Sequence, residues 1–327
     1  MNWKIKVAIQ WWLGYLPLGH RVNFLLQKLG RVHKPAYKAK RAIGLAKRIA
    51  SLRAYVPIEG SVVAEVGTGW DAINALLFHL LGAAEIHTYD HLPHVRLSLL
   101  QTLIAVIAPK TQELSEATGV AKPLLDARLA KLKEAQGSLA SLLSAAGIRY
   151  HAPADACMTG LPDRSVDIFF SMAVLEHVPE PVLSGLAKEA KRILKPDGVC
   201  FHEIGLNDHY ITVDRGITKV NFLKYSDRAW DFWVNRPGIG YHNRWREKQF
   251  LELFEGFGAN FLSVAGEVDP KDLEALKSFA VDPKFARFTA RELAVSSTCL
   301  ALRFPEGPAG AATDSREAAA ASARPAG

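Results

Sequence analysis

The sequence has 327 residues, 49% of them apolar, which is enough for one large domain or two small ones with a sizeable core. No stretch reaches the roughly 18 to 20 apolar residues that a membrane-spanning helix needs. The three cysteines, Cys157, Cys200 and Cys299, lie far apart without metal-ligand spacing, which argues against a disulfide framework. We therefore expect reduced thiols, no metal and a cytoplasmic protein.

The net charge of +7 is unevenly distributed along the chain. Residues 1–58 contain twelve Lys or Arg and no acidic residue, and the rest of the chain has 28 basic and 33 acidic residues. The positive charge thus belongs to an N-terminal arm, residues 1–57, and the body that follows is mildly acidic. Such an arm favours an anionic surface, either phospholipid or nucleic acid, and nucleic acid is the less favoured of the two.

Aromatic side chains in this arm lie among cationic ones: Trp3, Trp11, Trp12 and Tyr15 among Lys4, Lys6 and Arg21. Indole rings and cations together favour the headgroup region of a bilayer, so this segment is predicted to be an interfacial helix at the inner membrane face. The alternative is that these aromatic side chains pack on the catalytic domain or form an oligomer contact.

Periodicity in the first part of the chain predicts a basic helix that Pro57 ends, then alternating strands and helices. These elements are a helix over 38–56, a strand over 62–66, a helix over 72–81 stopped by Gly82, and a strand over 86–90. Residues 94–147 are helical without a strand, as two helices or a helical hairpin inserted in the domain.

Later segments continue the alternation and end in a tail rich in Ala, Gly, Pro and Ser that we expect to be disordered. They are strands over 148–151, 166–171, 199–204, 259–265 and 297–304, helices over 183–194 and 245–256, an irregular aromatic segment over 207–243, and the tail over 305–327. The pattern predicts an α/β domain over 58–304 with a doubly wound, mostly parallel sheet of seven strands.

A turn from Glu65 to Gly69, extended to Ala72, follows the first predicted strand. Its glycines let the backbone turn tightly and approach a ligand. Asp90 ends the next strand, 23 residues after Gly67, where a carboxylate can bind a ribose diol. The turn also satisfies the looser dinucleotide fingerprint, so a nicotinamide cofactor competes. Glu65 weighs against it, because a carboxylate there would repel a pyrophosphate and suit a cationic, zwitterionic ligand.

Two downstream blocks decide between these cofactors. Leu161–Val178 resembles the fourth-strand motif of class I S-adenosylmethionine-dependent methyltransferases, and Arg192–Gly198 is similar to their helix-to-fifth-strand signature. The resemblance covers roughly residues 60–205 and is nearest to the methyltransferase type 11-like branch, which includes many small-molecule and glycan methyltransferases. It implies a Rossmann-like fold and S-adenosyl-L-methionine as the cofactor.

The same resemblance implies roles for individual residues. These are Glu65, Gly67 and Gly69 around the methionine part, Asp90 at the ribose with His91 or Leu92 beside the adenine, Asp155 and Ala156 at the adenine edge, and Ser171 with Met172 where cofactor and substrate meet. Asp71 departs from the family pattern because it replaces a third glycine. We expect it either to cap the following helix or to narrow the methionine end of the site.

Candidate bases follow the fourth and fifth strands, at the edge where such folds bind ligands. His177 titrates near neutrality, and His209 has Asp208 beside it in support. In each case the alternative is that the residues only order a loop. The segment 207–250 is expected to be a substrate cap, since residues 222–250 hold eight of the thirty aromatic residues; these rings either contact substrate or form a small core of their own.

The sequence thus predicts methyl transfer from S-adenosyl-L-methionine, directed to a hydroxyl of a small-molecule, sugar or lipid-linked acceptor. A nicotinamide-dependent oxidoreductase is the competing enzyme class. A catalytically degenerate methyltransferase domain acting as a membrane-associated binding module is the non-enzymatic alternative.

Overall fold

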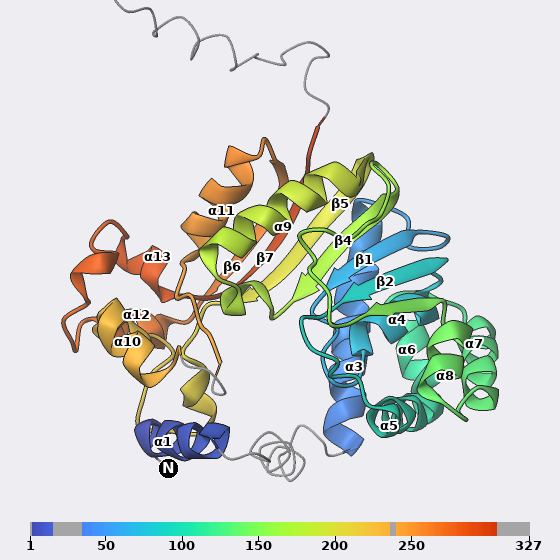
Figure 1. Ribbon diagram of the computed structural model, residues 1–327, viewed down its shortest axis with the longest axis horizontal. Helices are drawn as coiled ribbons and strands as arrows, with labels where there is room; N and C mark the ends of the chain where they lie inside the picture. Colours follow the sequence, from blue (N-terminus) through green and yellow to red (C-terminus); the bar gives the residue numbers. More distant parts are fainter. Residues whose placement is uncertain (1, 16–34, 236–239, 306–327) are drawn as a thin grey trace, which may run out of the picture.

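The structure, a computed structural model, describes residues 2–15, 35–235 and 240–305 (Figure 1). The tail predicted to be disordered lies, from residue 306 on, outside the described residues. The sheet has seven strands in the order β3-β2-β1-β4-β5-β7-β6. Strand β7 is antiparallel to both neighbours and the other adjacent pairs are parallel, which confirms the predicted fold class. The strands are Val62–Val66, Glu85–Tyr89, Ile148–His151, Val166–Met172, Leu194–Gly205, Asn260–Val268 and Val295–Arg303 in chain order.

Helix α3, Pro35–Ser51, begins three residues before the prediction and continues as a 3-10 turn over Leu52–Ala54. Its basic side chains leave one apolar stripe, in which Ala42, Ala46 and Ile49 are fully buried. This stripe packs with α4, Ile73–Leu81, in the core on one face of the sheet. The helix of the basic arm therefore contributes to the core of the domain.

The insertion contains four α-helices, so the prediction of two helices or one hairpin was wrong. They are α5, Leu97–Ile107, α6, Thr111–Thr118, α7, Lys122–Glu134, and α8, Leu139–Ala145, with a 3-10 turn over Ala108–Lys110. Pro109 and Gly119 divide the stretch: the proline lies in the 3-10 turn, and the glycine, at a φ of +73°, ends α6.

Two helices cover the other face of the sheet. They are α9, Glu180–Ile193, and α11, Glu247–Gly256, both close to their predicted positions (Figure 1). Leu183, Leu186 and Ile193 of α9 form a second core with Phe250 and Phe254 of α11. The sheet is thus covered on both faces, as a doubly wound fold requires.

A third apolar cluster lies beside the end of the sheet that carries β6 and β7. It is built by α1, Trp3–Tyr15, by the cap helix α10, Asp227–Trp233, and by elements between β6 and β7 that the sequence did not predict. These are α12, Pro270–Leu276, a 3-10 turn over Pro283–Phe285, and α13, Ala290–Ala294. The rest of the cap holds 3-10 turns over His209–Thr212 and Asn221–Lys224.

Trp3 anchors α1 to the cap. Its ring lies between 5.2 and 6.3 Å from those of Tyr210, Tyr225, Trp230 and Trp233, and its backbone N–H donates to Asp214 Oδ2 at 2.9 Å. The prediction that arm aromatics pack on the catalytic domain is confirmed for this residue. Within the described ranges no helix combines the length and the apolar character needed to cross a bilayer.

Candidate active site

The turn after β1 brings backbone close to the fourth strand's exit. Gly67 and Gly69 have φ of +87° and +68°, a region that favours glycine. A Cβ on Gly67 would overlap the side chain of Val174, which follows β4. The turn therefore requires a glycine at this position, because of its positive φ and because Val174 packs directly against it.

Glu65 is fully buried at the base of this turn. Its Oε1 accepts from Asn74 Nδ2 at 3.0 Å and its Oε2 accepts from Thr88 Oγ1 at 2.8 Å. Burial raises the pKa of Glu65 to about 7, although both hydrogen bonds oppose the shift. Because both oxygens are engaged, Glu65 joins β1, β2 and α4 and supports the turn from beneath. Asn74 and Thr88 are members of this network that sequence reasoning missed.

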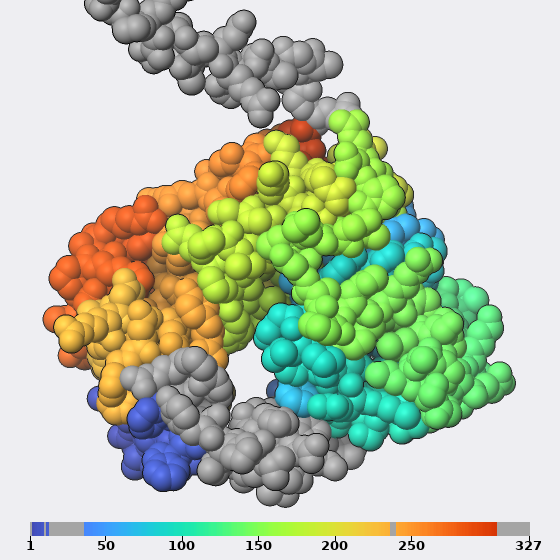
Figure 2. All heavy atoms as spheres, viewed as in Figure 1, coloured from blue at the N-terminus to red at the C-terminus, as the bar shows by residue number. Residues whose placement is uncertain are grey.

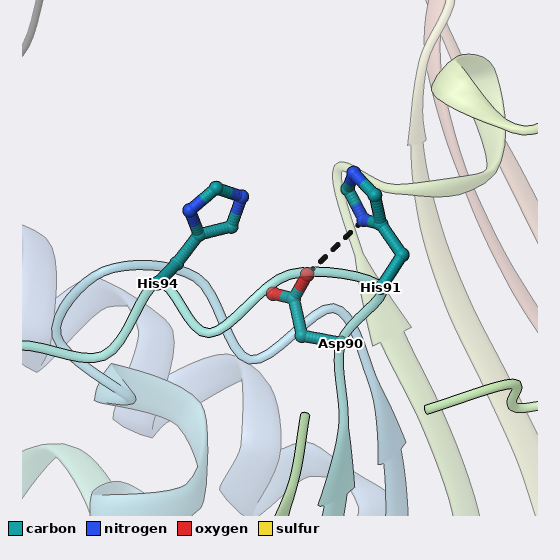
Figure 3. Close-up of side chains that lie close together, drawn as sticks. All are labelled: Asp90, His91 and His94. Carbon is teal, nitrogen blue, oxygen red and sulfur yellow. Dashed lines mark ion pairs between the residues drawn. The ribbon is translucent and has the colours of Figure 1, made fainter. Parts of the chain in front are cut away.

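Asp90 follows β2 and is held in place by the same turn. Its Oδ2 accepts from the Gly69 N–H at 3.2 Å and its Oδ1 from the Leu92 N–H at 3.3 Å. Figure 3 shows the carboxylate between the rings of His91 and His94, paired with His91 Nδ1 at 3.1 Å. The predicted ribose-binding carboxylate is thus preorganised by backbone donors.

Asp71 does not cap a helix, which corrects one of the two expectations for it. Ala72, with a φ of 45°, occupies the position before α4, and the helix begins without a side-chain cap. Asp71 Oδ2 instead pairs with Lys38 Nζ of α3 at 3.2 Å, and the side chains are only 13% and 3% exposed. The irregular residue of the motif therefore ties the turn to α3.

A cleft of about 410 Å³ opens along the carboxyl ends of β1, β2 and β4. Figure 2 shows this face of the molecule, which is hollowed beside the cyan residues that follow β2. The cleft is lined by Val66, Gly67, Tyr89, Asp90, His91, Ala154, Asp155, Ala156, Val174, His177, Val178, Pro179, Val182 and Leu186. Gly67, Asp90, His91, Asp155 and Ala156 were all predicted cofactor residues.

The other predicted cofactor residues do not line the cleft. Glu65 is buried beneath the turn, and Gly69 donates its backbone N–H to Asp90. Ser171 is fully buried and its Oγ lies 2.7 Å from His202 Nδ1 on the neighbouring strand β5. Burial lowers the pKa of His202 to about 3, so this ring is neutral and the contact is an uncharged hydrogen bond inside the sheet.

Three histidines gather where β4 and β5 end. His177 belongs to the 3-10 turn Leu175–His177, His209 to the turn after β5, and His242 to the cap segment before α11. The ring of His209 lies 4.9 Å from that of His177 and 4.7 Å from that of His242. His242 was not predicted from the sequence as a site residue. Its position between the aromatic residues of the cap was the one feature that could have indicated it.

Burial is the main cause that lowers the pKa of each ring in this histidine cluster. The pKa of His209 falls to about 4 and that of His242 falls well below its usual value. The pKa of His177 is also lowered, with partial compensation from the Tyr241 carbonyl that its Nδ1–H contacts at 2.7 Å. All three are neutral imidazoles at neutral pH, able to accept a hydrogen bond or bind a cation.

A second cavity, of about 180 Å³, lies against this cluster. It is lined by Lys6, His177, His209, Tyr210, Trp230, Val234, Gly240, Tyr241 and His242. His177 lines both this cavity and the cleft, so the two volumes are neighbours at this residue. Lys6 brings a cation from α1 into the cavity, and burial lowers its pKa.

Asp208, expected to support His209, is occupied elsewhere. Its Oδ1 accepts from the Tyr210 N–H at 2.9 Å and its Oδ2 from Asn221 Nδ2 at 3.0 Å. The residue is 1% exposed and caps the 3-10 turn that presents His209. In the structure Asp208 thus orders the loop that carries His209.

Most cap aromatics pack in a core of their own, which was one of the two expectations. Phe222 and Trp230 are buried, and the Arg244 guanidinium lies over the Trp230 ring while donating to the Tyr225 carbonyl at 2.5 Å. Trp230 and Tyr241 are the members of the predicted aromatic set that also line the cavity. The side chain of Arg246 is likewise buried and donates to the carbonyl of Leu206 at 2.8 Å.

The sheet order, with one antiparallel strand inserted between β5 and β6, and the cleft at the carboxyl edge are those of a class I methyltransferase fold. Residues 124–202 match the family described as "Methyltransferase domain". The match contains Leu161–Val178 and Arg192–Gly198, and the turn at Gly67 lies outside it. Together these findings identify a methyltransferase domain with the fold of the class I S-adenosylmethionine-dependent methyltransferases. Its cofactor is S-adenosyl-L-methionine.

Several solved structures resemble the chain at low identity. An S-adenosylmethionine-dependent methyltransferase from Mesorhizobium loti is 15% identical, with 79% of this chain and 97% of that one covered and a TM-score of 0.42. A phosphoethanolamine N-methyltransferase from Haemonchus contortus, bound to phosphomonomethylethanolamine and S-adenosylhomocysteine, is 16% identical over 80% and 53%, with a TM-score of 0.40. The cyclase SpnF is 17% identical over 80% and 82%, with a TM-score of 0.42. TM-scores of 0.40 to 0.42 do not assign a function to this chain. No curated protein matches the chain.

The cleft fits this cofactor. Asp90 offers hydroxyl-binding oxygens, and Gly67, which has no Cβ and packs against Val174, exposes its backbone at the end of β1. A volume of about 410 Å³ is within the range of small-molecule sites, roughly 300 to 1,000 Å³.

Proposed function

We propose that the chain transfers the methyl group of S-adenosyl-L-methionine to a hydroxyl of a small-molecule, sugar or lipid-linked acceptor held in the cavity beside His177. One observation carries this proposal: His177 lines both the cleft and the cavity, so groups bound in each would approach one another beside this residue. When bound, the cofactor would supply a methyl group on a cationic sulfur: an acceptor lone pair attacks the methyl carbon, the C–S bond breaks, and its electrons stay on sulfur, which leaves as a neutral thioether.

On the cofactor side, we assign Gly67 to the methionine part, Asp90 to the ribose hydroxyls, and His91, Asp155 and Ala156 to the adenine. Asp155 Oδ1 accepts from the Cys157 N–H at 2.9 Å, which fixes the loop that would meet the adenine edge. Glu65 supports the cofactor indirectly by holding the turn in place, since its oxygens already accept hydrogen bonds from Asn74 and Thr88.

On the acceptor side, a neutral imidazole of the histidine cluster accepts the hydroxyl hydrogen bond and takes the proton as the new C–O bond forms. His209 is the proposed proton acceptor and His177 positions the hydroxyl, because the Tyr241 carbonyl fixes the His177 ring. Lys6 in the same cavity favours an acceptor that also carries an anionic group, as a lipid-linked sugar phosphate does.

The cofactor assignment is tested by calorimetric titration with S-adenosyl-L-methionine and with NADH. Binding of the dinucleotide alone would overturn it. Turnover is then followed as transfer of a radiolabelled methyl group into small molecules of a cell extract. Cofactor binding without any labelled product would instead favour a degenerate binding module.

The acceptor side is tested by His209→Gln and His177→Gln, which we expect to bind the cofactor normally and to lose most turnover. His79→Gln on α4, outside both volumes, is the matched control and should retain turnover. Near-normal rates in both site variants would show that positioning alone is sufficient.

We further propose an anionic membrane surface as a partner of α1. Ile5, Ile9 and Trp12 are spaced along one side of this helix and are 56%, 47% and 71% exposed, while Trp3 and Val7 face the cap. Apolar side chains on a basic segment suit the boundary between headgroups and acyl chains. The double variant Ile9→Ser/Trp12→Ser should sediment less with phosphatidylserine vesicles. Leu124→Ser, at an exposed position on α7, should not, and equal sedimentation of both would remove the proposal.

A further inference from the structure

Glu176 joins His177 and His209 in a group whose members can each offer one metal-ligand atom. These three atoms all lie within 4.8 Å of one another. The residues come from the turns after β4 and β5, which are adjacent parallel strands, so their side chains converge at one edge of the sheet. Two imidazoles and one carboxylate form a donor set that zinc and related divalent ions bind, with a coordination position left open for substrate.

One oxygen of Glu176 has no partner among the described residues. The residue is 2% exposed, and its Oε1 accepts from the Gly205 N–H at 3.1 Å. Its Oε2 is buried and has no hydrogen-bond partner in the part of the chain that the structure describes. A buried acceptor without a partner is costly, because it has lost its hydration without gaining a bond. A cation at this point would satisfy it.

His177 and Gly205 complete the arrangement. His177 contacts the Tyr241 carbonyl through Nδ1 at 2.7 Å, which fixes the ring and leaves Nε2 as the nitrogen available to a metal. A Cβ on Gly205 would lie 2.7 Å from Glu176 Oε1 and 3.5 Å from His209 Nε2. The missing side chain therefore keeps open the space between the carboxylate and the second histidine.

We propose that Glu176, His177 and His209 bind one divalent transition-metal ion, of the zinc class, where the cofactor cleft meets the acceptor cavity. Tetrahedral zinc with bonds of about 2.0 to 2.2 Å needs its ligand atoms roughly 3.4 Å apart, so the side chains close on the ion by small rotations. The inference rests on the proposed function for the place of the acceptor. There the ion would contact the acceptor hydroxyl and promote release of its proton to water before the methyl group is transferred, so that His209 would act as a metal ligand in place of taking the proton itself.

The chain has a second group of this kind, Asp90, His91 and His94 (Figure 3). It lies at the cofactor cleft, and both Asp90 oxygens already accept backbone N–H groups. His91 is 80% exposed and has no buried neighbour that would need a cation. This second group serves as the control for adventitious binding.

The test is direct metal binding by the full chain, without an affinity tag and freed of metal by a chelator. Titration with Zn²⁺ should give one site, and Co²⁺ should give the visible absorption of a tetrahedral complex. Glu176→Gln and His209→Gln should each weaken Zn²⁺ binding by about 100-fold or more, since even changes behind the ligands cost 10- to 100-fold. His91→Gln should leave it unchanged.

Affinity for S-adenosyl-L-methionine confirms that the domain is folded in Glu176→Gln and His209→Gln, and the urea denaturation midpoint confirms it in His91→Gln. Absence of Zn²⁺ and Co²⁺ binding, or equal affinity in Glu176→Gln, would overturn the inference. So would full methyl transfer by the chelator-treated chain, which would leave the proposed function standing. Metal binding together with the absence of any methyl transfer would support the inference and defeat the proposed function.

Discussion

Lys38 of α3 and Asp71 of the turn after β1 form a buried ion pair, 3.2 Å between Nζ and Oδ2. The pair connects the basic N-terminal part of the chain to the motif that shapes the cofactor cleft. It also explains why the family's third glycine is replaced here, since the carboxylate at this position has a partner of its own.

Removal of one member of this pair should cost more than removal of both. Asp71→Ala leaves Lys38 buried without a partner, and we expect the free energy of unfolding to fall by about 3 kcal/mol. The double variant Lys38→Met/Asp71→Leu replaces both charges with apolar side chains and should recover most of that loss. Urea denaturation measures both values. A double variant as unstable as the single one would contradict the explanation.

Gly67→Ala should weaken cofactor binding. Its Cβ would overlap Val174, and the φ of +87° is strained for alanine. We expect S-adenosyl-L-methionine affinity to fall by about tenfold or more, since a left-handed residue alone costs roughly 1 to 2 kcal/mol. Gly44→Ala on α3, where a Cβ meets nothing within 4 Å, should bind normally and gain about 0.5 to 1 kcal/mol of stability. Calorimetric titration with S-adenosyl-L-methionine measures the affinity of both variants, and equal affinities would contradict the prediction.

The alternation of strands and helices could be predicted because each element is marked by its own residues. Val62–Val66 is a run of mostly apolar residues before a glycine turn, and α9 carries one apolar face over Leu183 to Ile193. In the insertion, however, Pro109 and Gly119 interrupt a stretch of helical periodicity. The periodicity alone therefore does not show how many helices the stretch contains.

The residues that line the cofactor cleft could be predicted from local motifs, but the residues that line the acceptor cavity could not. Gly67 and Asp90 follow their strands directly, so the topology brings them together. His242 and Lys6 reach the cavity through tertiary packing, of the cap and of α1, and nothing in their sequence surroundings marks them. The proposed metal ligands lie on two separate turns without a spacing motif, so the sequence predicted no metal.

Trp3→Ala should destabilise the cap. The ring contacts four aromatic side chains and is 3% exposed, so its loss should cost about 3 to 5 kcal/mol. Trp12→Ala is the control, because Trp12 is 71% exposed and should change stability by no more than about 0.5 kcal/mol. Thermal and urea unfolding compare them. Equal effects would mean that α1 does not pack on the cap in solution.

Glu65→Gln should change the pH dependence of stability. Burial raises the pKa of Glu65 to about 7 from an ordinary 4.5, so between these pH values the folded chain holds a proton that the unfolded chain releases. Stability of the natural chain relative to Glu65→Gln is therefore full below about pH 4.5 and falls as the pH rises to 7, by roughly 3 kcal/mol. Urea denaturation at pH 5, 6 and 7 measures it. A constant difference would contradict the shift.

The proposed metal site tolerates no side chain at Gly205. Its φ is not in the left-handed region, so Gly205→Ala is compatible with the backbone, but the added methyl group would press on the Glu176 carboxylate beside the His209 ring. One methyl group can thus disable the chemistry while the cofactor cleft stays intact. Such a variant would hold its acceptor without consuming it, and could be used to capture the natural acceptor from an extract for mass spectrometry.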